Sequence, residues 1–377
     1  MIYDWIYLWE KLNSLQPGLD ISSEDDLLSM LGDSTVSYMS IPVAIKDLRR
    51  ELSEHMRCDN VIFLFGNGAS MYAGSRSTFD FKLERYAEGN AFAGVRQEIG
   101  KICSSVSGIE EQLNALVTIK SYFHIIKDTC KEKCVSVLIG RIKRDLIESF
   151  VNSINYTQLK CHIKLLEKLQ SYGALPRTQI YTTNYDLAFE YALEQLGFDY
   201  MDGFSGFVSR RFEPGALSEK GRLSLVKIHG SVNWFKDEHT IKAIQPKFTR
   251  NGQLSVSGAD PDLIYPASDK LYQTYSAPYS ELMRHMLDEM ETGSNVIMVL
   301  GYKYGDDHVN EILYKALGNQ DNTFYFFSYG ETEGSEFIQK MIVLEKRRKT
   351  INILSGHIFP AFNIFADSIL PSAEEIY

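Results

Sequence analysis

The chain has 377 residues, a length that suits two domains or one large domain with an insertion. Hydrophobic residues make up 44% and charged residues 23%, which is ordinary for a globular protein and excludes collagen-like, mucin-like and disordered classes. The net charge of −10 argues against nucleic-acid binding over a broad surface, because such binding needs clustered lysine and arginine.

The N-terminal residues show no basic leader followed by an apolar core, and no apolar run approaches the roughly 20 residues that span a bilayer. We therefore expect neither a signal peptide nor a membrane contact. The five cysteines are odd in number and scattered, which favours a reducing cytoplasm over a disulfide framework. Cys130 and Cys134 stand four apart in a helical pattern and could share a ligand, but a single such pair is weak evidence for a structural metal.

The first part of the chain predicts helices, then a strand, then more helices. We expect an N-terminal helical segment over residues 1–57, where residues 43–56 carry apolar side chains at helical spacing. Residues 61–65, VIFLF, form a short continuous apolar run, which is typical of a strand buried on both faces of a parallel sheet. From about 84 to 175 the pattern is helical again. We interpret this stretch as a helical insertion within a domain that spans residues 58–377.

Beyond the insertion, strands alternate with helices. Residues 238–262 are expected to be an irregular or β-rich loop. Short apolar runs predict strands at 322–330 and 350–356, a strand with its exit loop in 178–186, an apolar run within 223–237, and a strand, turn and helix over 295–317. This alternation predicts an α/β fold with a Rossmann-like, doubly wound parallel sheet, a helical insertion and N-terminal helices. In such a sheet, ligands bind beyond the carboxyl ends of the strands.

A glycine loop follows the first predicted strand in the sequence FGNGAS. Gly66 and Gly68 allow a tight turn and a close approach to a phosphate, and the N-terminus of a following helix would supply N–H donors. The loop lacks the full GxGxxG fingerprint of dinucleotide-binding proteins. An ordinary tight turn between a strand and a helix is therefore the alternative interpretation.

Asn184 and Asp186 follow the next predicted strand in the sequence TTNYD. An amide at a strand end can hold a ribose hydroxyl, a carboxamide or a water molecule. A nearby carboxylate can fix that amide or bind the amide of nicotinamide. An Asx turn with a helix cap is the alternative, because asparagine and aspartate favour both.

His229 comes directly after the apolar run LVKI and before Gly230 and Ser231. A histidine that titrates near neutrality can act as a general base toward a ribose hydroxyl, and Gly230 would leave room for a ligand. A structural histidine at a strand end is the alternative. His308, in the sequence GDDHVN, is expected on the surface of the first turn of a helix.

In this order, GNGAS, TTNYD, HGS and a late glycine-rich strand exit resemble the sirtuin family over roughly residues 60–355. The chain more closely resembles the bacterial sirtuin-like NAD hydrolases of anti-phage defence systems. Those proteins typically show HGSxxW, a YP segment with a lysine, and LGYSFxDxHxN. The corresponding sequences here are HGSVNW, IYPASDK and LGYKYGDDHVN.

The resemblance implies that NAD binds as a substrate in the crevice of the sheet. It assigns catalysis to Asn184, which would position ribose and water, to His229 as general base, and to Asp186, which would hold the nicotinamide amide. In the glycine loop, Asn67 replaces the small middle residue of the relatives, and Lys303 stands where they often have serine. The resemblance assigns NAD binding to Gly66, Asn67, Gly68, Ala69, Ser70, Thr183, Gly230, Ser231, Gly301 and Tyr302.

The implied reaction cleaves the bond between nicotinamide and ribose, gives nicotinamide and ADP-ribose, and depletes NAD in anti-phage (abortive infection) defence. Deacylase sirtuins carry two Cys-x-x-Cys pairs after the catalytic histidine, whereas no cysteine follows His229 here, so no zinc is expected. The alternatives are a sirtuin-type ADP-ribosyltransferase, deacylase or cyclase, and a non-catalytic sensor of NAD or ADP-ribose. We expect a cytoplasmic homo-oligomer, and the resemblance implies a HerA-type ATPase as a partner.

Overall fold

The computed structural model describes residues 41–58, 60–76, 81–88, 90–106, 108–149, 153–207, 209–217, 221–237, 240–248, 254–255, 263, 277–329, 335–356 and 361–376. Most of the predicted N-terminal helical segment, and the sequence IYPASDK, lie outside these residues. The described part of that segment is helix α3, Ile41–Cys58, as the helical spacing predicts.

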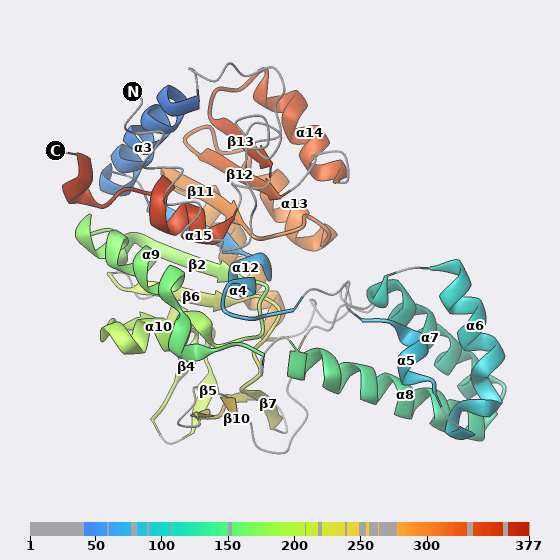
Figure 1. The fold of residues 1–377 in the computed structure, drawn as a ribbon. Coiled ribbons are helices and arrows are strands. Elements are labelled where there is room, and N and C mark those ends of the chain that lie inside the picture. Colours follow the sequence, from blue (N-terminus) through green and yellow to red (C-terminus); the bar gives the residue numbers. More distant parts are fainter. Residues whose placement is uncertain are drawn as a thin grey trace.

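A seven-stranded parallel sheet forms the centre of the fold (Figure 1). Its strand order is β13-β12-β11-β1-β2-β6-β3, and every neighbouring pair is parallel. The predicted α/β, Rossmann-like fold is therefore confirmed. The strands are β1 (Asn60–Phe65), β2 (Thr178–Thr182), β3 (Tyr200–Met201), β6 (Leu223–Lys227), β11 (Asn295–Leu300), β12 (Thr323–Tyr329) and β13 (Ile351–Gly356).

Both faces of this sheet are buried, because side chains alternate along each strand. In β1, Val61, Phe63 and Phe65 belong to one hydrophobic core, and Ile62 and Leu64 belong to the other. The first core is covered by α3, α9 (Lys160–Ser171), α10 (Ala188–Leu196) and α15 (Phe362–Ile364). The second is covered by α12 (Tyr279–Glu291), α13 (Asp307–Ala316) and α14 (Glu336–Glu345).

The chain between β1 and β2 is helical, as expected, and its helices lie in two places. Helix α9 packs on the central sheet, whereas α5 to α8 form a group at one side of it (Figure 1). In α8 the buried residues Val135, Leu138, Ile142 and Leu146 recur at spacings of three and four and so share one helix face. The short helix α4 (Gly68–Met71) comes soon after β1. The group at the side consists of α5 (Leu83–Tyr86), α6 (Arg96–Ser105), α7 (Ile109–Ile125) and α8 (Thr129–Ile147). The division into domains stays a prediction.

A small antiparallel sheet has the strand order β4-β5-β8-β7, and its strands come from the chain on either side of β6. Trp234 of β7 is buried and packs against Phe204 of β4 with ring centroids 4.8 Å apart, which anchors the chain that leaves His229. The strands are β4 (Phe204–Ser205), β5 (Arg210–Phe212), β7 (Trp234–Asp237) and β8 (Thr240–Ala243), and a separate pair is β9 (Lys247–Phe248) with β10 (Leu254–Ser255). Within the residues described here, no helix is both long and apolar enough to cross a membrane.

Candidate functional site

Four strands end at the same level of the central sheet. Phe65 at the end of β1 pairs in register with Thr182 of β2 and with Leu300 of β11, and Thr182 pairs with Lys227 of β6. The loops that begin after these strands carry all of the predicted site residues. The sheet therefore brings the four sequence clusters to one edge, as expected for a doubly wound fold.

The glycines of two of these loops pack against each other. A Cβ atom on Gly66 would lie 2.5 Å from the carbonyl oxygen of Gly301, and one on Gly68 would lie 2.7 Å from the Cα of Gly301. Gly301 itself has φ +64°, a left-handed conformation that favours glycine. Helix α4 has only four residues, so its dipole is small. Loop packing thus explains the glycine pattern, and pyrophosphate binding stays a prediction.

Two further side chains assigned to NAD make their contacts inside their own loops. The amide of Asn67 accepts a hydrogen bond from Ser75 Oγ at 2.6 Å and donates one to the carbonyl oxygen of Arg76 at 2.8 Å. The hydroxyl of Tyr302 accepts from the backbone N–H of Asp306 at 3.1 Å and donates to its carbonyl oxygen at 3.2 Å. Both side chains stabilise the loops that frame the strand ends.

Ser70, Asn184 and Asp186 form a buried hydrogen-bonded chain. The hydroxyl of Ser70 is hydrogen-bonded to the carboxylate of Asp186, and the amide nitrogen of Asn184 donates to Ser70 Oγ at 3.0 Å. Because a carboxylate can only accept, the Ser70 hydroxyl donates its hydrogen bond to Asp186 and accepts one from the amide N–H of Asn184. This order of donors and acceptors fixes the orientation of the Asn184 amide. Among the residues that the structure describes, the buried amide oxygen of Asn184 has no hydrogen-bond partner.

Lys227, two residues before the predicted base His229, contacts this hydrogen-bonded chain of side chains through Asp186. Lys227 is 3% exposed and forms an ion pair with Glu190 at 2.9 Å, and its ammonium also donates to the carbonyl oxygens of Tyr185 and Asp186. Burial raises the pKa of Asp186 and of Glu190 above the usual carboxyl range, and Lys227 opposes this rise. Asp186 also accepts from the backbone N–H of Ala188 at 3.0 Å, which ties it to the start of α10.

His229 lies two residues beyond β6 and is 3% exposed. Its Nε2 atom is 2.9 Å from Nε2 of His308, and the two ring centroids are 5.1 Å apart. His308 does occupy the first turn of α13, but it is half-buried and contacts His229. Its place in the first helix turn agrees with the expectation, but its ring is only partly exposed, because the loop before α13 turns this helix end toward the loop after β6.

Residues 178–353 match the SIR2-like domain family. This stretch covers less than half of the 377 residues and runs from β2 into β13, so it includes Asn184 and His229 but neither β1 nor the glycine loop. The match supports a sirtuin-like family and, with it, an NAD-related function. No similar sequence was found among curated proteins.

The remaining predicted site residues contribute mainly through their backbone. The N–H of Thr183 donates to the carbonyl oxygen of Phe65 at 3.0 Å, which joins the ends of β1 and β2. Gly230 has φ +89°, a conformation suited to glycine, so the chain can turn sharply after His229. Ser231 is fully buried, and its hydroxyl lies 3.5 Å from the carbonyl oxygen of Tyr185. Ala69 is also fully buried in the turn after β1.

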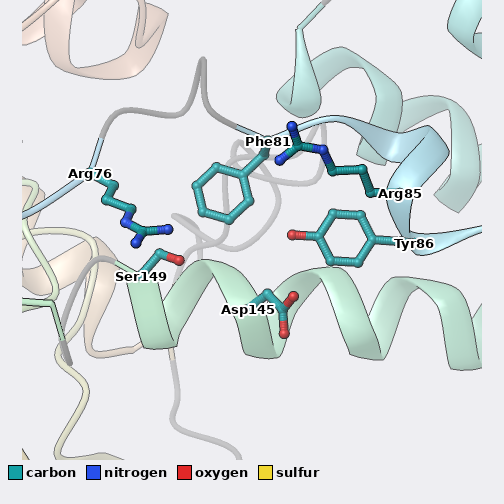
Figure 2. A pocket seen from close by; sticks show the side chains of 6 residues that line it. All are labelled: Arg76, Phe81, Arg85, Tyr86, Asp145 and Ser149. Atoms are coloured by element: carbon teal, nitrogen blue, oxygen red, sulfur yellow. The ribbon is translucent and has the colours of Figure 1, made fainter.

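A pocket of about 290 Å³ lies away from the strand ends, where α5 and α8 meet the chain after α4 (Figure 2). None of the predicted site residues lines it. Its lining residues are Arg76, Phe81, Arg85, Tyr86, Asp145 and Ser149. Among the described residues, no cluster of three or more metal-ligating side chains is found. Cys134 lies within 3.7 Å of the carbonyl oxygen of Ala91, and Cys130 is exposed.

The sequence interpretation missed Lys227 and did not connect His308 with His229. Lys227 stands in a strand with all five residues buried, and a charged residue in such a run could have suggested a buried partner. His308 follows a predicted strand and a glycine-rich loop, so its position at a carboxyl strand end could have placed it beside His229.

Proposed function

We propose that the protein hydrolyses NAD at the bond between nicotinamide and ribose, giving nicotinamide and ADP-ribose. One observation carries the proposal: the amide oxygen of Asn184 lies buried at a strand end, within the segment that matches the SIR2-like domain, and has no partner in the described part of the chain. A buried acceptor without a partner is costly unless a ligand satisfies it. A water molecule or a ribose hydroxyl is a suitable donor to it.

In the proposed reaction, the carbon–nitrogen bond to nicotinamide breaks while a water oxygen bonds to the same ribose carbon. The transition state resembles an oxocarbenium ion, as in glycoside cleavage. The amide oxygen of Asn184 would accept a hydrogen bond from the water or from a ribose hydroxyl. His229 would take the proton that the water loses, and nicotinamide would leave as a neutral molecule.

The Ser70 hydroxyl contributes by fixing the Asn184 amide before any ligand binds. Asp186 in turn holds the Ser70 hydroxyl, so the orientation of the catalytic acceptor depends on a buried carboxylate. Such preorganisation lowers the reorganisation needed in the transition state. In this proposal Asp186 keeps its structural contacts and also binds the nicotinamide amide.

Hydrolysis is favoured over deacylation because no cysteine follows Cys161, so the chain lacks the paired-cysteine module with which deacylase sirtuins build their acyl-lysine groove. An ADP-ribosyltransferase or a cyclase would release nicotinamide without a matching amount of free ADP-ribose. A sensor would bind NAD without turnover. The identity and stoichiometry of the products therefore separate these three alternatives from a hydrolase.

The test is chromatographic analysis of NAD incubated with the wild type, with Asn184→Ala and with His229→Ala. We expect equal amounts of nicotinamide and ADP-ribose from the wild type, and at least about 100-fold less from each variant. Lys340→Ala is the control, because Lys340 is exposed on α14, where it pairs with Glu336, and its loss should leave turnover unchanged. Full turnover by either site variant, or none by the wild type, would refute the assignment.

We also propose that the protein depletes NAD during anti-phage defence as a homo-oligomer, with a HerA-type ATPase as partner. A freely active NAD hydrolase would deplete its own cell, and in this proposal assembly controls the activity. Tyr122, Ile125 and Ile126 are exposed at the end of α7 and form a candidate contact for a second copy. Light scattering should give a mass above that of one 43.0 kDa chain, and a monomeric mass would contradict the proposal.

A further inference from the structure

The pocket of about 290 Å³ between α5, α8 and the chain after α4 lies apart from the strand ends. Its volume is close to that of the smaller pockets that bind small molecules, roughly 300 Å³. Figure 2 shows that its side chains point toward one space. The guanidinium group of Arg76 and the hydroxyl of Ser149 lie at one side, and the ring of Tyr86 lies at the other. The pocket therefore has a polar end and an aromatic end.

The lining of this pocket carries more positive than negative charge. It includes two arginines, Arg76 and Arg85, and one carboxylate, Asp145, and both arginines are exposed to solvent. The salt bridges between described residues include neither arginine. A planar guanidinium group matches the oxygens of a phosphate group, so this lining favours a phosphate-bearing anion.

The aromatic end suits a neutral ring better than a second anionic group. The carboxylate of Asp145 accepts a hydrogen bond from the hydroxyl of Tyr86. Burial and this carboxylate raise the pKa of Tyr86 to about 12, so its phenol is neutral at neutral pH. Nucleobases of any sequence stack on aromatic side chains. A free phosphate would contact only the polar end, whereas a nucleoside phosphate would contact both ends.

The chain that carries Arg76 is hydrogen-bonded to the glycine loop at three points. The N–H of Ser75 donates to the carbonyl oxygen of Ser70 at 3.1 Å, and its hydroxyl donates to the amide oxygen of Asn67 at 2.6 Å. The amide nitrogen of Asn67 donates to the carbonyl oxygen of Arg76 at 2.8 Å. A ligand that fixes Arg76 therefore acts on the loop whose Ser70 holds the Asn184 amide.

We propose that the pocket binds a nucleoside monophosphate, with its phosphate against Arg76 and Ser149 and its base against Tyr86. Arg85 adds a second positive charge that attracts the anion. Occupation of the pocket restrains the chain at Ser75 and Arg76, and the hydrogen bonds to the glycine loop then open less often. This site is separate from the strand ends, and the inference does not depend on cleavage of NAD.

The first test is calorimetric titration of the full chain with adenosine monophosphate (AMP) and with inorganic phosphate. We expect AMP to bind at least about 5-fold more tightly than phosphate, because the base stacks on Tyr86. Arg76→Gln should weaken AMP binding at least about 10-fold, since a charge-assisted hydrogen bond is lost. Arg347→Gln is the matched control: Arg347 is exposed just beyond α14, and its loss should leave the affinity unchanged.

Asn184→Ala separates this pocket from the strand-end site and should bind AMP as the wild type does. Absence of AMP binding, equal affinity in Arg76→Gln and the wild type, or loss of binding in Asn184→Ala would overturn the proposal. Equal affinities for phosphate and AMP would overturn the assignment to a nucleoside phosphate. Because Arg76 is exposed, its replacement is compatible with the fold, which circular dichroism checks.

The second test measures hydrogen exchange of the backbone amides in residues 66–76. Saturating AMP should slow this exchange at least about 3-fold in the wild type and leave it unchanged in Arg76→Gln. Unchanged exchange in wild-type protein that binds AMP would overturn the link to the glycine loop. Neither test uses NAD, so a wild type that binds AMP but does not cleave NAD would refute the proposed function alone.

Discussion

Replacing Lys227 by methionine should destabilise the protein strongly, because it removes the cation from a buried cluster. The Lys227 ammonium is the partner of Glu190 at 2.9 Å, and it donates to the carbonyl oxygens of Tyr185 at 3.3 Å and of Asp186. Removing one member of a buried ion pair costs roughly 3–5 kcal/mol. The side chain of Glu190 is 16% exposed and can be partly rehydrated, so we expect a loss near the lower end, about 3 kcal/mol.

The size of this loss should depend on pH in a defined direction. Burial already raises the pKa of Glu190 and Asp186 in the folded state, and loss of the nearby ammonium raises both further. A carboxyl whose folded pKa lies above its unfolded value contributes stability that is fully present below the unfolded pKa, about 4, and is lost as the pH rises through the folded pKa. The deficit of Lys227→Met should therefore be larger at about pH 8 than at about pH 5.

Urea unfolding followed by circular dichroism at these two pH values measures the free energy of unfolding. The double variant Lys227→Met, Glu190→Gln should recover about 1–2 kcal/mol of the deficit, because one uncompensated charge is gone. Lys236→Met is the matched control: Lys236 is exposed on β7, and its loss should cost less than about 0.5 kcal/mol. A deficit below about 1 kcal/mol, or one that grows as the pH falls, would refute the reasoning.

Three further predictions concern the surroundings of the site. Burial lowers the pKa of His162 to about 3, so the stability tied to its neutral ring is present above pH ~6.5 and lost as the pH falls. Between about pH 7 and pH 4, the free energy of unfolding of His162→Leu should fall by roughly 3 kcal/mol less than that of the wild type. Urea titrations at the two pH values measure this, and equal losses would contradict it. Gly66→Ala should lower the thermal midpoint by several degrees, whereas Gly140→Ala, which meets no atom within 4 Å on α8, should leave it unchanged or raised. Ser70→Ala should lower NAD turnover about 10-fold, because the Asn184 amide loses its anchor; unchanged turnover in the product assay would refute that role.

The sheet could be predicted from the sequence because its central strands are continuous apolar runs. Residues 61–65 and 295–300 belong to the buried strands β1 and β11, and their ends carry the glycines that the two loops need. The small antiparallel sheet was not predicted in detail. Its strands β4 and β5 have two and three residues, which is too short for an alternating pattern to be recognised.

The contacts of the site could be predicted only in part. The alternation of strands and helices places Asn184 and His229 at one edge, because parallel strands end on the same side. The alternation does not give the strand order. The contact between His229 and His308 depends on that order, because the loops after β6 and β11 meet beyond the ends of β1 and β2. The burial of Lys227 likewise depends on the register of β6 against β2 and on the helix that follows β2.

The glycine loop shows why a sequence resemblance must be separated into fold and function. Gly66, Gly68 and Gly301 meet one another's backbone at distances that no Cβ atom tolerates, so these glycines are required for the two loops to pack, whatever ligand is bound. The same pattern in relatives therefore indicates a shared strand-end geometry before it indicates a phosphate. NAD chemistry is supported instead by the buried amide oxygen of Asn184, which has no partner among the described residues, and by the close contact between His229 and His308. Neither feature is needed to form the sheet, and both place reactive atoms where a doubly wound fold binds its ligand.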